Sequence, residues 1–298
     1  MLISDFSQLA YAVVYAMKID IQKGSDDEIM HIIRNGTLSM LRSYKRKFRD
    51  YSGQMVVACD GSRYWRYDIF PEYKASRKEK RKDDDMPWDV IKPCIDQLID
   101  ELSDVMPYKF IRHHAAEADD VCAIIVEDVV NKTPITIGLE ETVDAVLLVN
   151  KDKDVQQLLK HPNVRMHSPY TQKFVTCEHQ PKEFLRRLIL TGDSGDGIPN
   201  IFSPIDAFVT KTRQSAATEK RMQPFLLAEN MLDVADTDAI KNRLIMNTRL
   251  ISFGAIPKNI RKEVVDMYHE PIKGSKMKLY SYLVKNGCDM LSDNVDEF

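Results

Sequence analysis

Short runs of apolar residues that end in an aspartate recur along the chain. They occupy residues 1–5 (MLISD), 55–60 (MVVACD) and 146–152 (VLLVNKD). Continuous apolar runs of this length are typical of strands that are buried on both faces of a parallel sheet. Between and around them, apolar positions repeat at helical spacing over about residues 28–49, 88–106 and 117–130. This alternation predicts an α/β fold with a central, mainly parallel sheet flanked by helices.

The pattern becomes mostly helical after about residue 180. Residues 181–190 (PKEFLRRLIL) begin with a proline, which suits the first turn of a helix, and the later helix-like segments are interrupted by Pro204, Pro224, Pro257 and Pro271. We therefore expect an α/β domain over residues 1–180 and a C-terminal helical region over residues 181–298. The polar residues 131–142 are expected to form a surface elaboration.

The order of the charges is more informative than their balance. With 42 basic and 45 acidic residues the net charge is −3, so the whole chain lacks the basic excess of many nucleic-acid-binding proteins. Residues 74–82 (KASRKEKRK) nevertheless gather six basic residues and one acid, directly before three aspartates. An isolated basic run is usually a solvated helix face. This run follows the acidic end of a predicted strand by a few residues, which favours the capture of phosphate.

Two further observations restrict the class of protein. No apolar run approaches the roughly 20 residues of a membrane-spanning helix, which excludes such a helix. The five cysteines are scattered without a CxxC pair, so we expect a reducing compartment and neither disulfides nor structural zinc.

The acidic residues point to a metal site. Ligands of open α/β sheets bind beyond the carboxyl ends of the strands, so Asp5, Asp60 and Asp152 should converge. Further acids open a predicted helix (Glu117, Asp119 and Asp120), follow Asp152 (Asp154) or lie in a glycine-rich turn (Asp193 and Asp196). Any one of them could be a helix cap or a turn residue. Together they predict a site for a hard cation such as Mg²⁺ or Mn²⁺, which prefers carboxylate oxygens.

His113 and His114 precede the acidic helix start. We do not assign them to this site, because imidazole prefers softer metals and a set of carboxylates is sufficient for magnesium.

These motifs resemble the 5′ nuclease superfamily of flap endonucleases and 5′-3′ exonucleases, and most of all its branch of T-even-type phage ribonucleases H. The resemblance covers essentially the whole chain. It is carried by Asp5-Phe-Ser, by Tyr73-Lys74 followed by Arg77, by Glu117-Ala-Asp119-Asp120, by residues 151–154 (KDKD), by residues 192–196 (GDSGD) and by the C-terminal residues 278–285 and 295–298. It implies a PIN-like 5′ nuclease fold, in which the basic residues 71–88 form a helical arch and residues 181–298 bind DNA.

The resemblance also implies roles for individual residues. Asp5, Asp60, Glu117, Asp119 and Asp152 would hold one metal ion, and Asp154, Asp193 and Asp196 a second. Two Mg²⁺ ions, for which Mn²⁺ would substitute, fit in-line phosphodiester hydrolysis. Lys74, Arg77 and Asp152 would be the catalytic residues, and Lys74 and Arg77 would stabilise the scissile phosphate. Further DNA contacts would come from Tyr73, by stacking on a base, and from Lys78, Lys80, Arg81, Lys82, Lys211 and Arg213.

The segment after Asp196 should correspond to the helix-hairpin-helix-like element of the family, which grips duplex phosphates. Residues 197–199 (GIP) fit its first part, but residues 200–206 (NIFSPID) lack the paired glycines of cellular members. We therefore assign this role to the region and not to individual residues of it.

The activity that the resemblance implies is that of a magnesium-dependent, structure-selective 5′ nuclease. It would act on DNA flaps, nicked DNA and RNA·DNA hybrids, and would remove RNA primers from lagging-strand fragments during phage replication, in the cytoplasm of the infected bacterium. It would work as a monomer, with a single-strand-binding protein and a sliding clamp as partners. Two alternatives are a catalytically silent branched-DNA-binding protein, which would not need the full set of acids, and a PIN-like metal-dependent ribonuclease, which would not need the arch.

Overall fold

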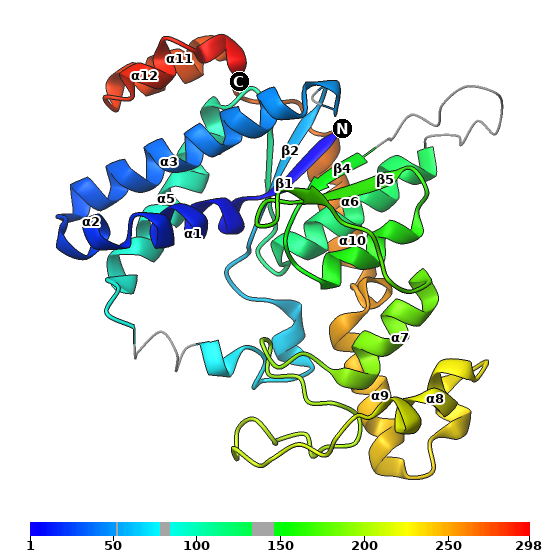
Figure 1. The fold of residues 1–298 in the computed structure, drawn as a ribbon. Coiled ribbons are helices and arrows are strands. Elements are labelled where there is room, and N and C mark those ends of the chain that lie inside the picture. The colour runs from blue at the N-terminus through cyan, green and yellow to red at the C-terminus, as the bar shows by residue number, and fades with distance from the viewer. Residues whose placement is uncertain (52, 78–83, 133–145) are drawn as a thin grey trace.

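A six-stranded sheet forms the centre of the molecule. The computed structural model describes residues 1–51, 53–77, 84–132 and 146–298. The strands are β1 (Leu2–Asp5), β2 (Met55–Cys59), β3 (Lys109–Arg112), β4 (Val146–Val149), β5 (Val164–Ser168) and β6 (Lys173–Phe174), in the order β3-β2-β1-β4-β5-β6. All neighbours are parallel except β6, which pairs antiparallel with β5. The carboxyl ends of β1, β2 and β4 therefore lie side by side (Figure 1).

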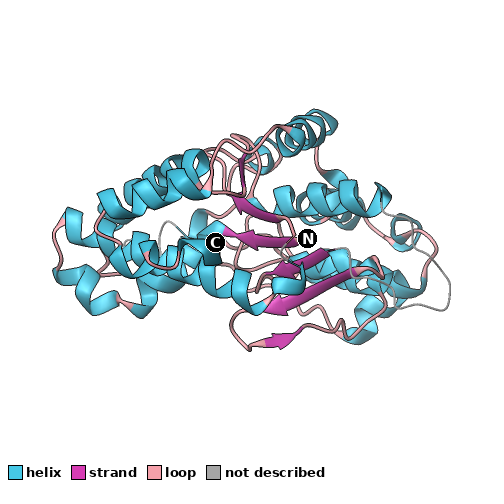
Figure 2. Cartoon of the chain, turned by 90° about the horizontal axis from the view of Figure 1, so that it is seen from above, coloured by secondary structure: helices cyan, strands magenta, loops and turns pink. Residues whose placement is uncertain are grey.

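Helices cover both faces of this sheet, because successive strand residues point to opposite sides. Leu2 and Val57 belong to one hydrophobic core with α1 (Phe6–Ala16), α3 (Asp26–Lys47), α5 (Trp88–Val105) and α11 (Lys276–Lys285). Ile3 and Val56 belong to the other core, with α6 (Ala118–Lys132) and α10 (Lys258–His269). Seen from above, the sheet is the middle layer of three (Figure 2).

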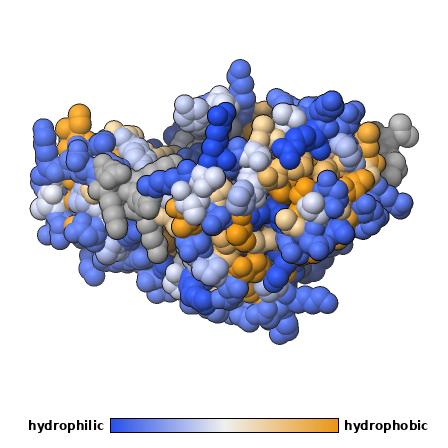
Figure 3. All heavy atoms as spheres, turned by 90° about the horizontal axis from the view of Figure 1, so that it is seen from below, coloured by the Kyte–Doolittle hydropathy of each residue, from blue (hydrophilic) through white to orange (hydrophobic). Residues whose placement is uncertain are grey.

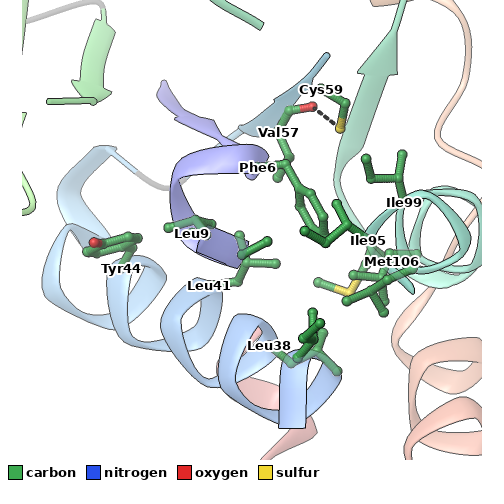
Figure 4. Packing of buried hydrophobic residues seen from close by; sticks show 14 of the residues in the cluster. Phe6, Leu9, Leu38, Leu41, Tyr44, Val57, Cys59, Ile95, Ile99 and Met106 are labelled. Carbon is green, nitrogen blue, oxygen red and sulfur yellow. Dashed lines mark hydrogen bonds between the residues drawn. The ribbon is translucent and has the colours of Figure 1, made fainter. Parts of the chain in front are cut away.

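The first core fixes α1 and α3 against the sheet. Phe6 and Leu9 of α1 lie between Leu41 of α3 and Ile95 of α5, and all four side chains are buried (Figure 4). A capping box at Ser25 and Glu28 starts α3, because each side chain accepts a hydrogen bond from the backbone amide of the other.

The C-terminal region is divided between a separate cluster and the sheet. Helices α7 (Pro181–Thr191), α8 (Glu219–Leu227) and α9 (Asp238–Ile251) form a third hydrophobic cluster, which also takes in Phe70 and Tyr73. Then α10 returns to one face of the sheet, and α11 with the short α12 (Asp289–Ser292) to the other. The division into two domains near residue 180 stays a prediction. Both hydrophobic cores beside the sheet include residues from beyond that position.

The predicted fold class is confirmed, and so are the three strands that end in aspartate. The predicted helices at 28–49, 88–106 and 117–130 correspond to α3, α5 and α6 with shifts of one or two residues at most ends. The expected break at Pro224 is wrong. That residue lies inside α8, whose buried Met222 and Phe225 hold the helix against its neighbours. The polar segment 131–142 lies almost entirely outside the described residues.

Hydrophilic residues dominate the surface on the side of α8 and α9, with hydrophobic side chains visible between them (Figure 3). Across the described part of the chain, no helix combines the length and apolar character needed to cross a membrane.

Candidate active site

A cavity of about 340 Å³ opens at the carboxyl ends of β1, β2 and β4. Seven of the eight predicted metal ligands line it: Asp5, Asp60, Glu117, Asp119, Asp152, Asp154 and Asp196. They come from segments spread over nearly 200 positions of the sequence and meet because parallel strands end at one edge of the sheet. Lys74 and Arg77 of the predicted arch line the same cavity.

Asp5 and Asp60 are oriented by the first turn of α1. Asp5 is the N-cap of this helix, and its carboxylate accepts hydrogen bonds from the backbone amide and the side chain of Gln8, at 3.1 and 3.0 Å. Ser7 donates to Asp60 at 2.6 Å, and the amide of Ala118 donates to the other oxygen of Asp60 at 3.1 Å. The start of α1 and the start of α6 thus fix the two strand-end carboxylates.

Arg66 organises the acidic start of α6. It lies in the 3₁₀ turn Trp65–Asp68, has only 4% of its surface exposed, and donates to both oxygens of Asp120 at 2.7 Å. It also donates to Glu117 at 2.7 Å and to the backbone carbonyl of Leu250, at the end of α9. Asp120, which is fully buried, therefore supports Glu117 through Arg66 and does not line the cavity.

The base of the predicted arch is bound to the acidic residues. Lys74 has left-handed backbone geometry (φ 58°), and its ammonium group pairs with Glu117 and lies 3.8 Å from Asp196. Arg77 pairs with Asp196. In this structure the two cations neutralise carboxylates, and each is placed where a phosphate in the cavity could take over that contact.

Tyr73 does not fit the expected role of stacking on a base. Only 3% of its surface is exposed, and its hydroxyl lies within hydrogen-bonding distance of two carboxylates, 2.9 Å from Glu117 and 2.7 Å from Asp196. The ring packs in the cluster formed by α7, α8 and α9, so no face of it is available to a nucleotide. Tyr73 is a residue that positions two carboxylates.

The turn that carries Asp193 and Asp196 depends on glycine. Gly192 ends α7 with φ 66°, and a side chain at this position would collide with the carbonyl groups of Ile198 and Pro199. Paired backbone hydrogen bonds between Asp193 and Ile198 close the turn, at 2.8 and 2.7 Å. The amide of Lys74 donates to the carbonyl of Asp196 at 2.8 Å, so this turn is attached to the arch.

Asp193 is the one predicted ligand that does not line the cavity. One of its oxygens accepts from the amides of Gly195 and Asp196, and the other lies 3.2 Å from the ammonium group of Lys153. Burial alone would raise the pKa of Asp193, but Lys153 and the two amides lower it below its ordinary value.

Asp152 and Asp154 follow β4 in a turn built from their own side chains. The amide of Asp152 donates to Asn150 at 2.7 Å, and the amide of Asp154 donates to Asp152 at 2.9 Å. Asn150 in turn donates to Asp119 and accepts from Gln8. The Oδ1 atom of Asp154 is buried, and no group of the described residues donates a hydrogen bond to it.

The crowding of carboxylates changes their pKa values. Burial and the charge of Asp60 raise the pKa of Asp5 to about 7, and burial and the charge of Asp152 raise the pKa of Asp154 to about 8. The pKa of Asp119 is raised well above its ordinary value, by burial first and then by the charges of Asp152 and Asp5. Each of these three groups therefore resists ionisation unless a cation is added.

Glu117 behaves differently because two cations are already beside it. Burial would raise its pKa, but Lys74 and Arg66 lower it below the ordinary value. Burial keeps the pKa of Asp196 raised in spite of Lys74 and Arg77.

The donor set fits divalent metal ions of the hard type. All the predicted ligands are carboxylates, and four of them have raised pKa values through burial or mutual repulsion. Asp154 also has a buried oxygen to which no group of the described residues donates a hydrogen bond. The oxygens are too widely spaced for all of them to bind one ion directly, since the only tight group of ligand atoms found among the described residues lies elsewhere.

That tight group comprises His113, His114 and Glu263, whose ligand atoms lie within 4.8 Å of one another. The Nδ1 atom of His113 accepts from the amide of Ala115 at 3.2 Å, so its Nε2 atom carries the hydrogen and donates to Glu263 at 2.8 Å. This contact holds α10 against the loop before α6.

The remaining predicted DNA contacts lie away from the cavity. Lys211 and Arg213 are exposed on a loop of residues 200–218 that has no regular secondary structure. Asn200 closes this loop by donating to the carbonyl of Ser215 at 2.8 Å and accepting from Ser203 at 3.0 Å. Four more predicted contacts, Lys78, Lys80, Arg81 and Lys82, fall outside the described residues.

Four side chains of the site were not predicted from the sequence: Ser7, Gln8, Arg66 and Asn150. Ser7 and Gln8 follow the first strand-end aspartate, and Asn150 precedes Asp152, so their closeness to predicted ligands was a usable signal. Arg66 offered no such signal, because its partners are more than 50 positions away in the sequence.

Comparison with known proteins agrees with this geometry. The family described as 5′-3′ exonuclease, N-terminal resolvase-like domain, matches residues 1–188, and the family described as T4 RNase H, C terminal, matches residues 183–298. Ribonuclease H of enterobacteria phage T4 is 28% identical over 99% of this chain and 94% of its own. The flap endonuclease Xni of Shewanella piezotolerans is 30% identical over 52% of this chain and 56% of its own.

Solved structures share the fold. A bacteriophage T5 flap endonuclease in a pseudo-enzyme-product complex with DNA and metal ions superposes with a TM-score of 0.62 at 14% identity, over 90% of this chain and 99% of its own. A T5 5′-exonuclease with bound zinc ions gives a TM-score of 0.59 at 16% identity, over 90% of this chain and 99% of its own. The resemblance inferred from the motifs is confirmed, and the chain belongs to the 5′-3′ exonuclease family of nucleases.

Proposed function

We propose that this chain is a divalent-metal-dependent, structure-selective 5′ nuclease that hydrolyses phosphodiesters in 5′ flaps, nicked DNA and RNA·DNA hybrids. One observation carries the proposal. Seven carboxylates from distant parts of the sequence line one cavity together with Lys74 and Arg77. Such a density of buried acids opposes the binding of a polyanion unless cations are present.

Mg²⁺ ions held by these carboxylates, with Mn²⁺ as a substitute, would supply an activated water and neutralise the leaving oxygen. The wide spacing of the carboxylates suits two ions that are bound partly through water. Asp5, Asp60, Glu117, Asp119 and Asp152 would hold one ion, and Asp154, Asp193 and Asp196 the other. Asp193 would have to give up its pairing with Lys153.

The residues of the arch would bind the scissile phosphate. Lys74 and Arg77 would exchange Glu117 and Asp196 for the phosphate oxygens, since both carboxylates would then be neutralised by metal. Tyr73 and Arg66 would keep Glu117 in place during this exchange. The exposed Lys211 and Arg213 would contact duplex phosphates beyond the site.

The biological role that fits this activity is the removal of RNA primers and adjacent DNA from lagging-strand fragments in phage replication. We place the protein in the cytoplasm of the infected bacterium, as a monomer that meets a single-strand-binding protein and a sliding clamp at its substrate. The family relationship to a phage ribonuclease H supports this assignment.

Single-turnover cleavage of a 5′ flap and of a matching RNA·DNA hybrid tests the proposal, with Mg²⁺ or with EDTA, for the wild type and Asp152→Asn. We expect metal-dependent cuts near the flap junction, abolished by Asp152→Asn while DNA binding is retained. A flap that is bound but uncut with both Mg²⁺ and Mn²⁺ would instead favour a silent branched-DNA-binding protein. Cleavage of single-stranded RNA alone would favour a PIN-like ribonuclease.

A further inference from the structure

The wall of the cavity includes aromatic side chains as well as charges. Tyr11 and Tyr15 of α1 both line it. Tyr15 has 57% of its surface exposed although it belongs to the cavity wall. Single exposed aromatic residues are common on protein surfaces. This one differs from Tyr170, which is 87% exposed but is not among the residues that line the cavity.

Helical spacing directs Tyr15 toward the same side as the carboxylates. Ser7, Tyr11 and Tyr15 are four residues apart and therefore share one face of α1. Ser7 at the start of this face donates to Asp60. Since Asp5 is the N-cap of α1 and the helix rises 1.5 Å per residue, Tyr15 lies roughly 15 Å from Asp5 along the helix axis. Figure 1 shows α1 leading away from the end of β1.

A buried ring holds Tyr15 from one side. Trp88, the first residue of α5, meets Tyr15 edge to face with ring centroids 6.2 Å apart, and meets Tyr11 in the same way at 6.0 Å. Trp88 is only 8% exposed, so it is a fixed support. Contacts of this geometry fix the plane of an aromatic ring while leaving another face open. Trp88 is also the last residue of the predicted arch, residues 71–88.

We propose that Tyr15 is a stacking platform for a base of the substrate strand, a few nucleotides away from the scissile phosphate. The inference rests on the proposed nuclease function and deepens it, because it names a contact that recognises an unpaired base. Bases of single strands stack on exposed aromatic rings, whereas paired bases of a duplex are already stacked on their neighbours. Tyr15 would thereby favour substrates whose 5′ strand is single-stranded where it leaves the cavity.

Abasic substitution combined with mutation of Tyr15 tests the stacking directly. A 5′-flap substrate is prepared with one abasic nucleotide, moved position by position along the 5′ strand next to the cut. Binding by fluorescence anisotropy and single-turnover cleavage are measured for the wild type, Tyr15→Ala, Tyr15→Phe and the control Tyr170→Ala. Thermal unfolding of each variant verifies that the fold is retained.

We expect Tyr15→Ala to weaken binding of the intact flap about tenfold, which is the size of one base–aromatic stack, while Tyr15→Phe and Tyr170→Ala stay near the wild type. At one position of the strand, an abasic nucleotide should weaken flap binding by the wild type about as much as the Tyr15→Ala mutation does. The same abasic nucleotide should not weaken the binding of the Tyr15→Ala variant any further. Equal effects of Tyr15→Ala and Tyr170→Ala would overturn the inference. The inference would also be overturned if, at every position, the losses of affinity from the abasic nucleotide and from Tyr15→Ala multiplied, as independent effects do. A Tyr15→Phe variant that binds as weakly as Tyr15→Ala would overturn it too, since this result would indicate a contact by the hydroxyl.

The two proposals fail separately in this experiment. A wild type that binds flaps with the expected dependence on Tyr15 but never cuts them refutes the nuclease proposal and supports the platform. A wild type that cuts flaps with no dependence on Tyr15 supports the nuclease and refutes the platform.

Discussion

Lys74 is held at the candidate active site by interactions with acidic residues. Its ammonium group pairs with Glu117 and lies near Asp196, and its backbone amide binds the turn that carries Asp196. These interactions place one positive charge at a defined point before substrate arrives. Preorganised charge of this kind stabilises a transition state without reorganisation during the reaction.

We expect Lys74→Ala to slow single-turnover cleavage by about 10²-fold or more, as is typical when one electrostatic donor is removed. Flap affinity should change much less. Rapid-quench kinetics with saturating enzyme measures the rate, and anisotropy measures the affinity. The control is Lys262→Ala on α10, whose side chain is 80% exposed. A variant that is weakened in binding but cleaves at the normal rate when saturated would make Lys74 a phosphate anchor only.

Arg66 differs from Lys74 because its cation is almost completely buried, with 4% of the residue's surface exposed. It is shared between Glu117, Asp120 and the carbonyl of Leu250, so its removal leaves the buried Asp120 without its cation and Glu117 with Lys74 alone. We expect Arg66→Met to reduce the free energy of unfolding by about 3–5 kcal/mol, as for one partner removed from a buried ion pair.

Urea unfolding measures this change, with Arg63→Met as the control. Arg63 pairs with Asp68 but has 69% of its side chain exposed, so its removal should cost less than about 1 kcal/mol. Equal stabilities of the two variants would show that the Arg66 hydrogen bonds contribute little.

At the scale of elements, the sequence predicted what depends on local pattern. The strands β2 and β4 are unbroken apolar runs and β1 (LISD) begins with two apolar residues, and all three were predicted together with the aspartates at or after their ends. The strands β3 (KFIR) and β5 (VRMHS) were not, because polar residues interrupt them. Their assignment as strands comes from pairing with β2 and β4, which local periodicity does not encode.

The same distinction applies to the candidate site. The carboxylates were predictable because each follows a strand or opens a helix, and the topology then brings them together. The buried partner Arg66 was not predictable from spacing, because the acids that it binds are more than 50 positions away. Tyr73 has an aromatic ring that could stack on a base, but it is buried beneath Glu117 and Asp196. Its burial results from the tertiary packing of α7, α8 and α9, which the local sequence does not reveal.

The loop of residues 200–218 is the element in which we expect duplex DNA to be gripped. It is braced by Asn200 and exposes Lys211 and Arg213. Replacing both basic residues by glutamine should weaken duplex binding and leave the saturated cleavage rate unchanged, because neither lines the cavity. The affinity decreases with salt concentration, and the steepness of the plot of log affinity against log salt should decrease by about one for each phosphate that the variant no longer neutralises. An unchanged slope would exclude this loop from the duplex interface.

At the scale of the whole molecule, the C-terminal third completes the fold that holds the carboxylates. Ile260 and Val264 of α10 belong to the core that contains Ile3 and Val56, while Leu279 and Leu283 of α11 belong to the core on the opposite face. Both layers behind β1, which ends at Asp5, therefore include residues from beyond the predicted boundary near 180. The stability of the sheet and the geometry of the acidic site are for this reason coupled.

That coupling predicts how stability depends on pH and metal. The pKa values of Asp5 and Asp154 are raised to about 7 and about 8 in the folded protein, by burial and by neighbouring carboxylates. A raised folded-state pKa means that the native protein holds these protons more tightly than the unfolded chain does. Their contribution to stability is complete below the unfolded-state pKa of about 4 and disappears as the pH rises through 7 and 8.

A divalent cation removes the repulsion that causes this destabilisation, so its stabilising effect should grow over the same pH range. We expect Mg²⁺ or Mn²⁺ to raise the melting temperature more at pH 8.5 than at pH 6, relative to EDTA, by differential scanning fluorimetry. Both conditions lie above the range in which Glu117 and Asp193, whose pKa values are lowered, exchange protons. The Asp154→Asn variant should lose less stability than the wild type between pH 6 and pH 8.5 in EDTA, because one buried charge is absent. A metal-induced shift that is equal at both pH values would contradict the assignment of these carboxylates as a cation site, since protons and metal would then not compete for the same oxygens.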